Sequence, residues 1–287
     1  MRKILIIGNS HSVDAFHFLH DAFSDQMPDE EVTLGILYYS GCSIDKHIGF
    51  YKDNDPACDY YKNTDGEWSI SKKTALLKAV LEDEPWDIVF LQAAKVDLDD
   101  TLNLDGRREL EAIVNEHLKN PHGFGWHTSW PCPNDSYFFA EGRFVPNGYK
   151  ENLERLYGFD PFNQFAVLTG KAREHILADD TYTKKICSGA GVMNAYAGQG
   201  VPQTEIWRDY THLNENGRLI AAYTWYVQLT GNKIEKIGID TIPAHKRHKY
   251  FTELGDMTVT DDMKQVIIAA ANQSIDNTWY DYNKEKK

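Results

Sequence analysis

The sequence lacks the long apolar segments of a membrane protein. No stretch of its 287 residues approaches the roughly 18 to 20 apolar residues that a membrane helix requires. The first apolar run, residues 4–7, is shorter than the apolar region of a secretion signal and leads straight into Gly8. We therefore expect no membrane as a partner. We also expect a cytoplasmic location, or a secreted or periplasmic one if a leader has been removed from the sequence.

Cysteine and positive charge are also scarce. Cys42, Cys58, Cys132 and Cys187 show no Cys-x-x-Cys spacing, which argues against a zinc site. A chain of this length needs no disulfide framework, so we expect reduced and buried cysteines. Acidic residues outnumber basic ones by 43 to 30, and the resulting net charge of −13 argues against a nucleic-acid partner.

Apolar runs and helical segments alternate along the chain. Runs with the pattern of buried parallel strands occupy residues 3–7, 32–39, 87–91, 124–130 and 184–187. Apolar residues at helical spacing indicate helices at residues 13–23, 74–82, 104–118, 161–176, 219–229 and 261–279. This alternation predicts an α/β fold, a three-layer α/β/α sandwich around a mostly parallel five-stranded sheet.

We expect one domain over residues 1–287, because no repeat and no Ser/Gly-rich linker divides the chain. The core of this domain is expected at about residues 3–232. Residues 42–72 form an insertion, in which Asp65-Gly66 predicts the turn of a hairpin. Residues 233–287 form a C-terminal helical extension.

Polar residues follow the predicted strands, where ligand sites of such sheets lie. Ser10 follows the first strand, Gly41 the second and Gln92 the third, and Asp209 and His212 lie near the end of the chain. Together these residues supply the nucleophile, base, orienting carboxylate and oxyanion donors of an acyl-transfer site. The alternative is structural, with Ser10 as a helix cap and residues 209–212 as a capped loop.

The order of these motifs resembles that of the SGNH hydrolase superfamily, also called GDSL esterases. Gly8-Asn9-Ser10, the isolated Gly41 and Asp209-x-x-His212 carry the resemblance. It implies a flavodoxin-like sheet, a Ser10–His212–Asp209 triad, and the backbone N–H groups of Ser10 and Gly41 as oxyanion donors. It implies no metal and no cofactor.

Two blocks depart from the pattern of the superfamily. The first block has Asn9 where the name-giving form has Asp. The third block of the family reads Gly-x-Asn-Asp, whereas Gln92 and two alanines stand at this position. Gln92 is therefore either a third oxyanion donor or a polar residue satisfied by its neighbours.

A bacterial branch of the superfamily is more similar still. The Gly-Asn-Ser block, Leu91-Gln92 and Gly125-Trp126-His127 carry this likeness, and the branch resembles carbohydrate esterases. It implies a serine esterase that removes O-acyl, mainly O-acetyl, groups from a carbohydrate or a similar small molecule. The alternatives are a non-catalytic glycan-binding protein, a lipase or acyl-thioesterase of the same superfamily, and, more distantly, a phosphate- or nucleotide-binding protein.

Five residues are further candidates for substrate binding: Asn9, Tyr61, Trp68, His127 and Asn194. Tyr61 and Trp68 belong to the insertion, and aromatic rings of this kind either stack on a sugar or pack the hairpin onto the domain. His127 lies towards the end of the strand predicted at residues 124–130, and Asn194 follows the one predicted at 184–187; each either lines the cleft or packs in the core. The sequence does not indicate an oligomeric state.

Overall fold

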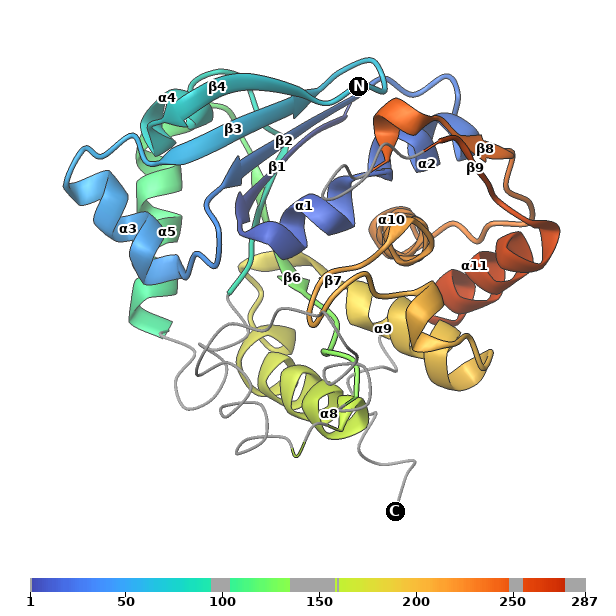
Figure 1. Cartoon of the computed structure of the whole chain (residues 1–287). Coiled ribbons are helices and arrows are strands. Elements are labelled where there is room, and N and C mark those ends of the chain that lie inside the picture. The colour runs from blue at the N-terminus through green and yellow to red at the C-terminus, as the bar shows by residue number, and fades with distance from the viewer. Residues whose placement is uncertain (1, 94–103, 135–157, 159, 248–254, 277–287) are drawn as a thin grey trace.

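A computed structural model describes residues 2–93, 104–134, 158, 160–247 and 255–276 of the chain (Figure 1). Its central sheet has seven strands in the order β4-β3-β2-β1-β5-β6-β7. Five of them are parallel to one another: β1 (Arg2–Gly8), β2 (Val32–Tyr38), β5 (Ile88–Leu91), β6 (Gly123–Thr128) and β7 (Tyr182–Cys187). The predicted α/β fold with a mostly parallel sheet is confirmed.

The sheet has seven strands instead of the five predicted, because the inserted hairpin joins it. The strands of the hairpin, β3 (Cys58–Asn63) and β4 (Ser69–Ala75), extend the sheet beyond β2 as antiparallel edge strands. Pairing with β3 satisfies the backbone groups along the free side of β2, which would otherwise be left unpaired. The turn is where the sequence predicts it, with Gly66 at a φ of +95°.

Helices cover both faces of the sheet (Figure 1). One face carries α1 (Ser10–Phe16), α2 (Leu19–Gln26), α9 (Ser188–Met193), α10 (Glu215–Thr230) and α11 (Asp261–Gln273). The other carries α3 (Ile44–Lys52), α4 (Leu77–Leu81), α5 (Leu104–His117) and α8 (Pro161–Ala172). Along β1, Ile4 and Ile6 pack on the first face and Leu5 and Ile7 on the second, which explains the unbroken apolar run.

The C-terminal extension is not purely helical. A two-stranded antiparallel ladder, β8 (Thr241–Ile242) and β9 (Met257–Thr258), precedes α11. The helix predicted at residues 261–279 ends at Gln273, and residues 277–279 lie outside the described part. All four cysteines are buried, as predicted, and none of them forms a disulfide. Within the described ranges, no helix is long and apolar enough to cross a membrane.

Candidate active site

The turn between β1 and α1 places Ser10 at the carboxyl end of the sheet. Asn9 caps α1, because its Oδ1 accepts a hydrogen bond from the backbone N–H of His11 at 3.0 Å. Its Nδ2 donates to the carbonyl of Cys42 at 3.2 Å, which ties the turn to the loop after β2. Gly8 is required by packing, since a Cβ atom there would stand 2.7 Å from Oε1 of Gln92.

Ser10, His212 and Asp209 form a continuous chain of hydrogen bonds. The Oγ of Ser10 lies 2.9 Å from Nε2 of His212. The other ring nitrogen, Nδ1, lies 3.0 and 2.9 Å from the two carboxylate oxygens of Asp209. The backbone N–H groups of Thr211 and His212 both donate to Oδ1 of Asp209, so that the turn itself holds the carboxylate. The structure thus brings Ser10 into contact with His212, which lies 202 positions further along the chain.

The charge of Asp209 determines which atoms donate and which accept in these hydrogen bonds. Burial would raise the pKa of Asp209, but the hydrogen bond from His212, the positive charge of this ring when it is protonated, and the backbone N–H groups hold it below its usual range. An ionised Asp209 accepts a hydrogen bond and has none to give, so Nδ1 of His212 carries the proton. Nε2 is then the acceptor for the hydroxyl of Ser10, as a general base requires.

The segments of Gly41 and Gln92, the candidate oxyanion donors, are tied by hydrogen bonds to the residues on either side of Ser10. Gly41 is exposed in the loop between β2 and α3 at a φ of +59°, and the tether from Asn9 holds the next residue of this loop. Gln92 is buried after β5, where its Oε1 accepts a hydrogen bond from the hydroxyl of Ser12. Its Nε2 has no hydrogen-bond partner among the described residues. Gln92 therefore presents an unused N–H group close to the nucleophile turn.

Sequence reasoning missed Asp14, which lies one helical turn after Ser10. Its carboxylate is buried and accepts hydrogen bonds from Arg208 at 2.9 and 3.0 Å, and from Arg218 at 2.9 and 2.7 Å. Burial would raise the pKa of Asp14, but the positive charges of Arg218 and Arg208 hold it well below its usual range. The signal in the sequence is a carboxylate directly beside the first apolar residues of the helix expected at residues 13–23.

A model of the family described as "Domain of unknown function (DUF4886)" matches residues 3–247 of the chain. The chain belongs to the DUF4886 family. Its fold is similar to the crystal structure of a DUF4886 family protein from Bacteroides uniformis, with a TM-score of 0.70 and 22% identity over 96% of this chain and 94% of that one. At this identity the likeness shows the fold alone.

Other solved structures are similar at lower scores. An α/β hydrolase enzyme from the metagenome of Lake Arreo, Spain, has a TM-score of 0.45 at 13% identity, over 80% of this chain and 95% of that one. An acetyl xylan esterase has a TM-score of 0.42 at 11% identity, over 78% of this chain and 98% of that one. No curated protein matches this member of the DUF4886 family.

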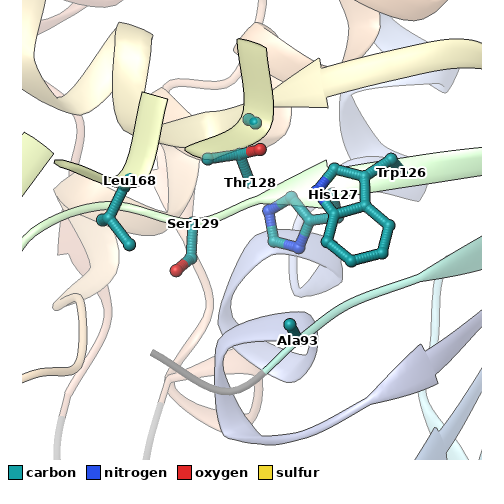
Figure 2. Close-up of a pocket in the computed structure, with 7 residues that line it drawn as sticks. Ala93, Trp126, His127, Thr128, Ser129 and Leu168 are labelled. Carbon is teal, nitrogen blue, oxygen red and sulfur yellow. The ribbon is translucent and has the colours of Figure 1, made fainter. Parts of the chain in front are cut away.

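A small pocket lies at the carboxyl ends of β5 and β6 of the DUF4886 protein (Figure 2). Its lining is wholly uncharged: Ala93, Trp126, His127, Thr128, Ser129, Leu168 and Ala172. Burial lowers the pKa of His127 to about 3, so that its ring is neutral. Nε2 of this ring contacts Oγ of Ser188 at 2.8 Å, whereas Nδ1, like Oγ1 of Thr128, has no partner within the described part of the chain.

Trp68 and Asn194, two other predicted substrate residues, make contacts away from Ser10. Because β3 runs antiparallel to β2, the β3–β4 turn with Trp68 lies at the amino end of the parallel strands, opposite the triad. Nε1 of Trp68 donates to the carbonyl of His17 at the far end of α1. Asn194 donates to the carbonyl of Ala270 and so holds α11. The geometry of these two side chains is that of packing contacts.

Tyr61 lies in the middle of β3, and its ring centroid is 6.0 Å from that of Tyr38. Tyr38 pairs with Gly8 in the register of β1 and β2, so Tyr61 on β3 lies two strands away from β1 and the nucleophile turn. Its binding role stays a prediction. Among the described residues of the DUF4886 protein, no group of three or more His, Cys, Asp and Glu side chains is placed to hold a metal ion.

Proposed function

We propose that the DUF4886 protein is a serine esterase of the SGNH hydrolase type. The observation that carries the proposal is the Ser10–His212–Asp209 chain at the carboxyl end of the sheet, with contacts of 2.9 Å on both sides of the imidazole. A helix cap alone would not need a histidine on the hydroxyl of Ser10, nor a carboxylate behind that histidine. This arrangement meets the geometric requirement of an activated nucleophile.

The proposed reaction proceeds in two steps. Oγ of Ser10 forms a bond to the acyl carbon while its proton passes to Nε2 of His212. The tetrahedral intermediate collapses, the ester C–O bond breaks, and His212 returns the proton to the leaving alcohol. A water then attacks the acyl-Ser10 ester as His212 takes its proton, and the acid is released as Ser10 regains its hydrogen. Asp209 stabilises the imidazolium that forms in each step.

The negative oxygen of the intermediate needs donors aimed at it. We assign this role to the backbone N–H groups of Ser10 and Gly41 and to Nε2 of Gln92. The hydrogen bond from Ser12 fixes the amide of Gln92 by its oxygen, which leaves the nitrogen side for the substrate. The departure from the asparagine of the superfamily is then a replacement of one amide donor by another.

The pocket beside Gln92 supports an uncharged, polar substrate. In the register of the sheet Leu91 pairs with Trp126, so Gln92 and His127 follow as neighbours on adjacent strands. A neutral His127 and the hydroxyl of Thr128 offer hydrogen bonds without charge, which suits a hydroxyl or a short acyl ester more than an ionised group. We propose O-acyl esters of a carbohydrate or a similar small molecule as the substrate class, with O-acetyl esters as the preferred substrates.

Hydrolysis of 4-nitrophenyl acetate tests the esterase. The parent protein should release 4-nitrophenol with saturation kinetics, and Ser10→Ala should lose at least about 10³-fold in kcat. Ser24→Ala, which removes an exposed serine on α2, is the matched control and should behave as the parent. Equal rates for the parent and Ser10→Ala would favour the alternative of a non-catalytic glycan-binding protein.

The substrate class needs a second series. Release of acetate from acetylated oligosaccharides should exceed release from the same sugars that carry longer acyl chains, and Thr128→Val should raise KM for the sugar ester more than for 4-nitrophenyl acetate. A preference for long acyl chains or thioesters would instead favour the lipase or acyl-thioesterase type.

A further inference from the structure

One carboxylate joins the two halves of the proposed triad. Asp14 belongs to α1, the helix that begins with Ser10, and α1 packs beside α10 (Figure 1). Arg208, which directly precedes Asp209, donates to both carboxylate oxygens of Asp14. The backbone N–H of Leu213, which directly follows His212, donates to Oδ2 at 3.0 Å. The turn that carries Asp209 and His212 is thus bound at both ends to the helix of the nucleophile.

A third segment completes the cluster. Arg218 on α10 donates to Oδ1 of Asp14 through Nε and Nη2, and both side chains are 1% exposed. Arg208 also donates to the carbonyl of Leu213, which closes its own turn. Because a buried carboxylate with a single partner would be costly, the set of donors matters as a whole. The cluster sets the position of the 208–213 turn relative to α1.

The cluster also controls a charge beside the triad. Nε of Arg208 lies 3.8 Å from Oδ2 of Asp209, so this guanidinium competes with His212 for the same carboxylate. Asp14 holds the guanidinium by its other end and offsets its charge. Among the described residues, the charged and titratable groups around His212 include Asp209, Arg208 and Asp14, together with the rings of His11 and Tyr210.

We propose that Asp14 is a positioning residue for His212: through Arg208 and Leu213 it fixes the imidazole against Ser10 and keeps Arg208 from capturing Asp209. The proposal rests on the proposed esterase function. A displacement of about 1 Å between reacting groups costs about 100-fold in rate, so the loss of this anchor should appear in kcat. Substrate affinity should change little, because Asp14 is buried away from solvent.

The test compares Asp14→Asn and Arg208→Gln with Asp25→Asn in the hydrolysis of 4-nitrophenyl acetate. Each rate is divided by the concentration of folded protein, which circular dichroism measures. Asp25 is the matched control, since it also links its helix to α10 through Tyr223 but lies on α2, outside the cluster. Asp14→Asn and Arg208→Gln should each lose about 100-fold in kcat with KM within about two-fold, and Asp25→Asn should keep the kcat of the parent. Arg208→Lys should restore part of the loss.

The pH profile separates positioning from a structural role. Loss of the negative charge of Asp14 disfavours a proton on His212, so the acid limb of kcat/KM should move to lower pH in Asp14→Asn. Loss of a positive charge should move it to higher pH in Arg208→Gln. If the cluster had a purely structural role, the substitutions would reduce the folded fraction and leave the acid limb of both variants where it is in the parent. If Asp14→Asn does not fold, Arg208→Gln decides, because Arg208 is 18% exposed.

The outcomes are distinguishable. A parent that hydrolyses the ester, with variants whose kcat and acid limbs match it, would overturn the positioning role and leave the esterase intact. A parent that shows no hydrolysis above Ser10→Ala would overturn both.

Discussion

Replacement of Asp209 by asparagine should prevent His212 from acting as the base without disturbing the turn at residues 208–213. Oδ1 of Asp209 accepts the N–H groups of Thr211 and His212 at 2.9 and 2.8 Å, and the amide oxygen of asparagine can keep both bonds. The amide nitrogen then stands at the place of Oδ2, 2.9 Å from Nδ1 of His212. Because that nitrogen donates, Nδ1 must accept, and the imidazole proton moves to Nε2.

In that tautomer His212 cannot take the proton of Ser10. We expect kcat to fall by about 10³- to 10⁴-fold, which corresponds to about 4 to 5.5 kcal/mol in the activation free energy. KM and the thermal midpoint should stay close to those of the parent. Stopped-flow and steady-state hydrolysis of 4-nitrophenyl acetate measure the rates, and differential scanning calorimetry measures the midpoint.

Asp179→Asn is the matched control for this variant. Oδ1 of Asp179 accepts the N–H of Thr181 two residues on, in the same local geometry, but its carboxylate pairs with Arg108 instead of a histidine. This variant should keep the kcat of the parent. If Asp209→Asn retained more than about a tenth of the parental kcat, the orienting role of Asp209 would be refuted.

Three further predictions concern stability. Gly8→Ala places a methyl group against Gln92 and should cost about 1 to 3 kcal/mol in urea unfolding, together with a lower kcat. Arg218→Leu leaves Asp14 underpaired in the core and should cost about 3 to 5 kcal/mol at pH 7, less below pH 4 as the carboxyl takes up a proton. Burial lowers the pKa of His47 to about 4, so the neutral ring stabilises the fold above pH 6.5 and this stability is lost as the pH falls towards 4. Urea unfolding of His47→Gln should therefore show a pH dependence smaller than that of the parent by up to about 3 kcal/mol over this range.

The parallel core of the sheet could be predicted because it depends on local pattern. A strand covered on both faces must be apolar at every position, and residues 4–7 show this directly. The position of Ser10 and His212 at one edge then follows from the rule that the carboxyl ends of parallel strands share an edge. This inference requires no knowledge of the distance between Ser10 and His212.

The break between α1 and α2 could not be predicted, because its cause is remote in sequence. One helix was expected at residues 13–23, and neither glycine nor proline interrupts it. The indole of Trp68 donates to the carbonyl of His17, and the chain leaves the helix at Phe18 with a ψ of 16°. A contact across 51 residues thus coincides with the end of a helix whose local sequence favours continuation.

The same limit applies to the hairpin and to Asp14. The turn of the hairpin is local and was predicted. The direction of β3 relative to β2 depends on pairing at the edge of the sheet, and this direction places Trp68 away from the site. Asp14 stands out in the sequence only as a carboxylate on a helix. Its partners Arg208 and Arg218 lie about 200 residues further on, so only the folded chain reveals the cluster.

Covalent capture of the nucleophile tests the central claim most directly. A fluorophosphonate should add once to the parent protein, and peptide mass spectrometry should place the adduct on Ser10. The adduct should be absent from Ser10→Ala and form at least about 10²-fold more slowly in His212→Ala, since the base activates the hydroxyl. An adduct on another residue, or labelling of Ser10→Ala at the rate of the parent, would contradict the assignment of Ser10 as the nucleophile.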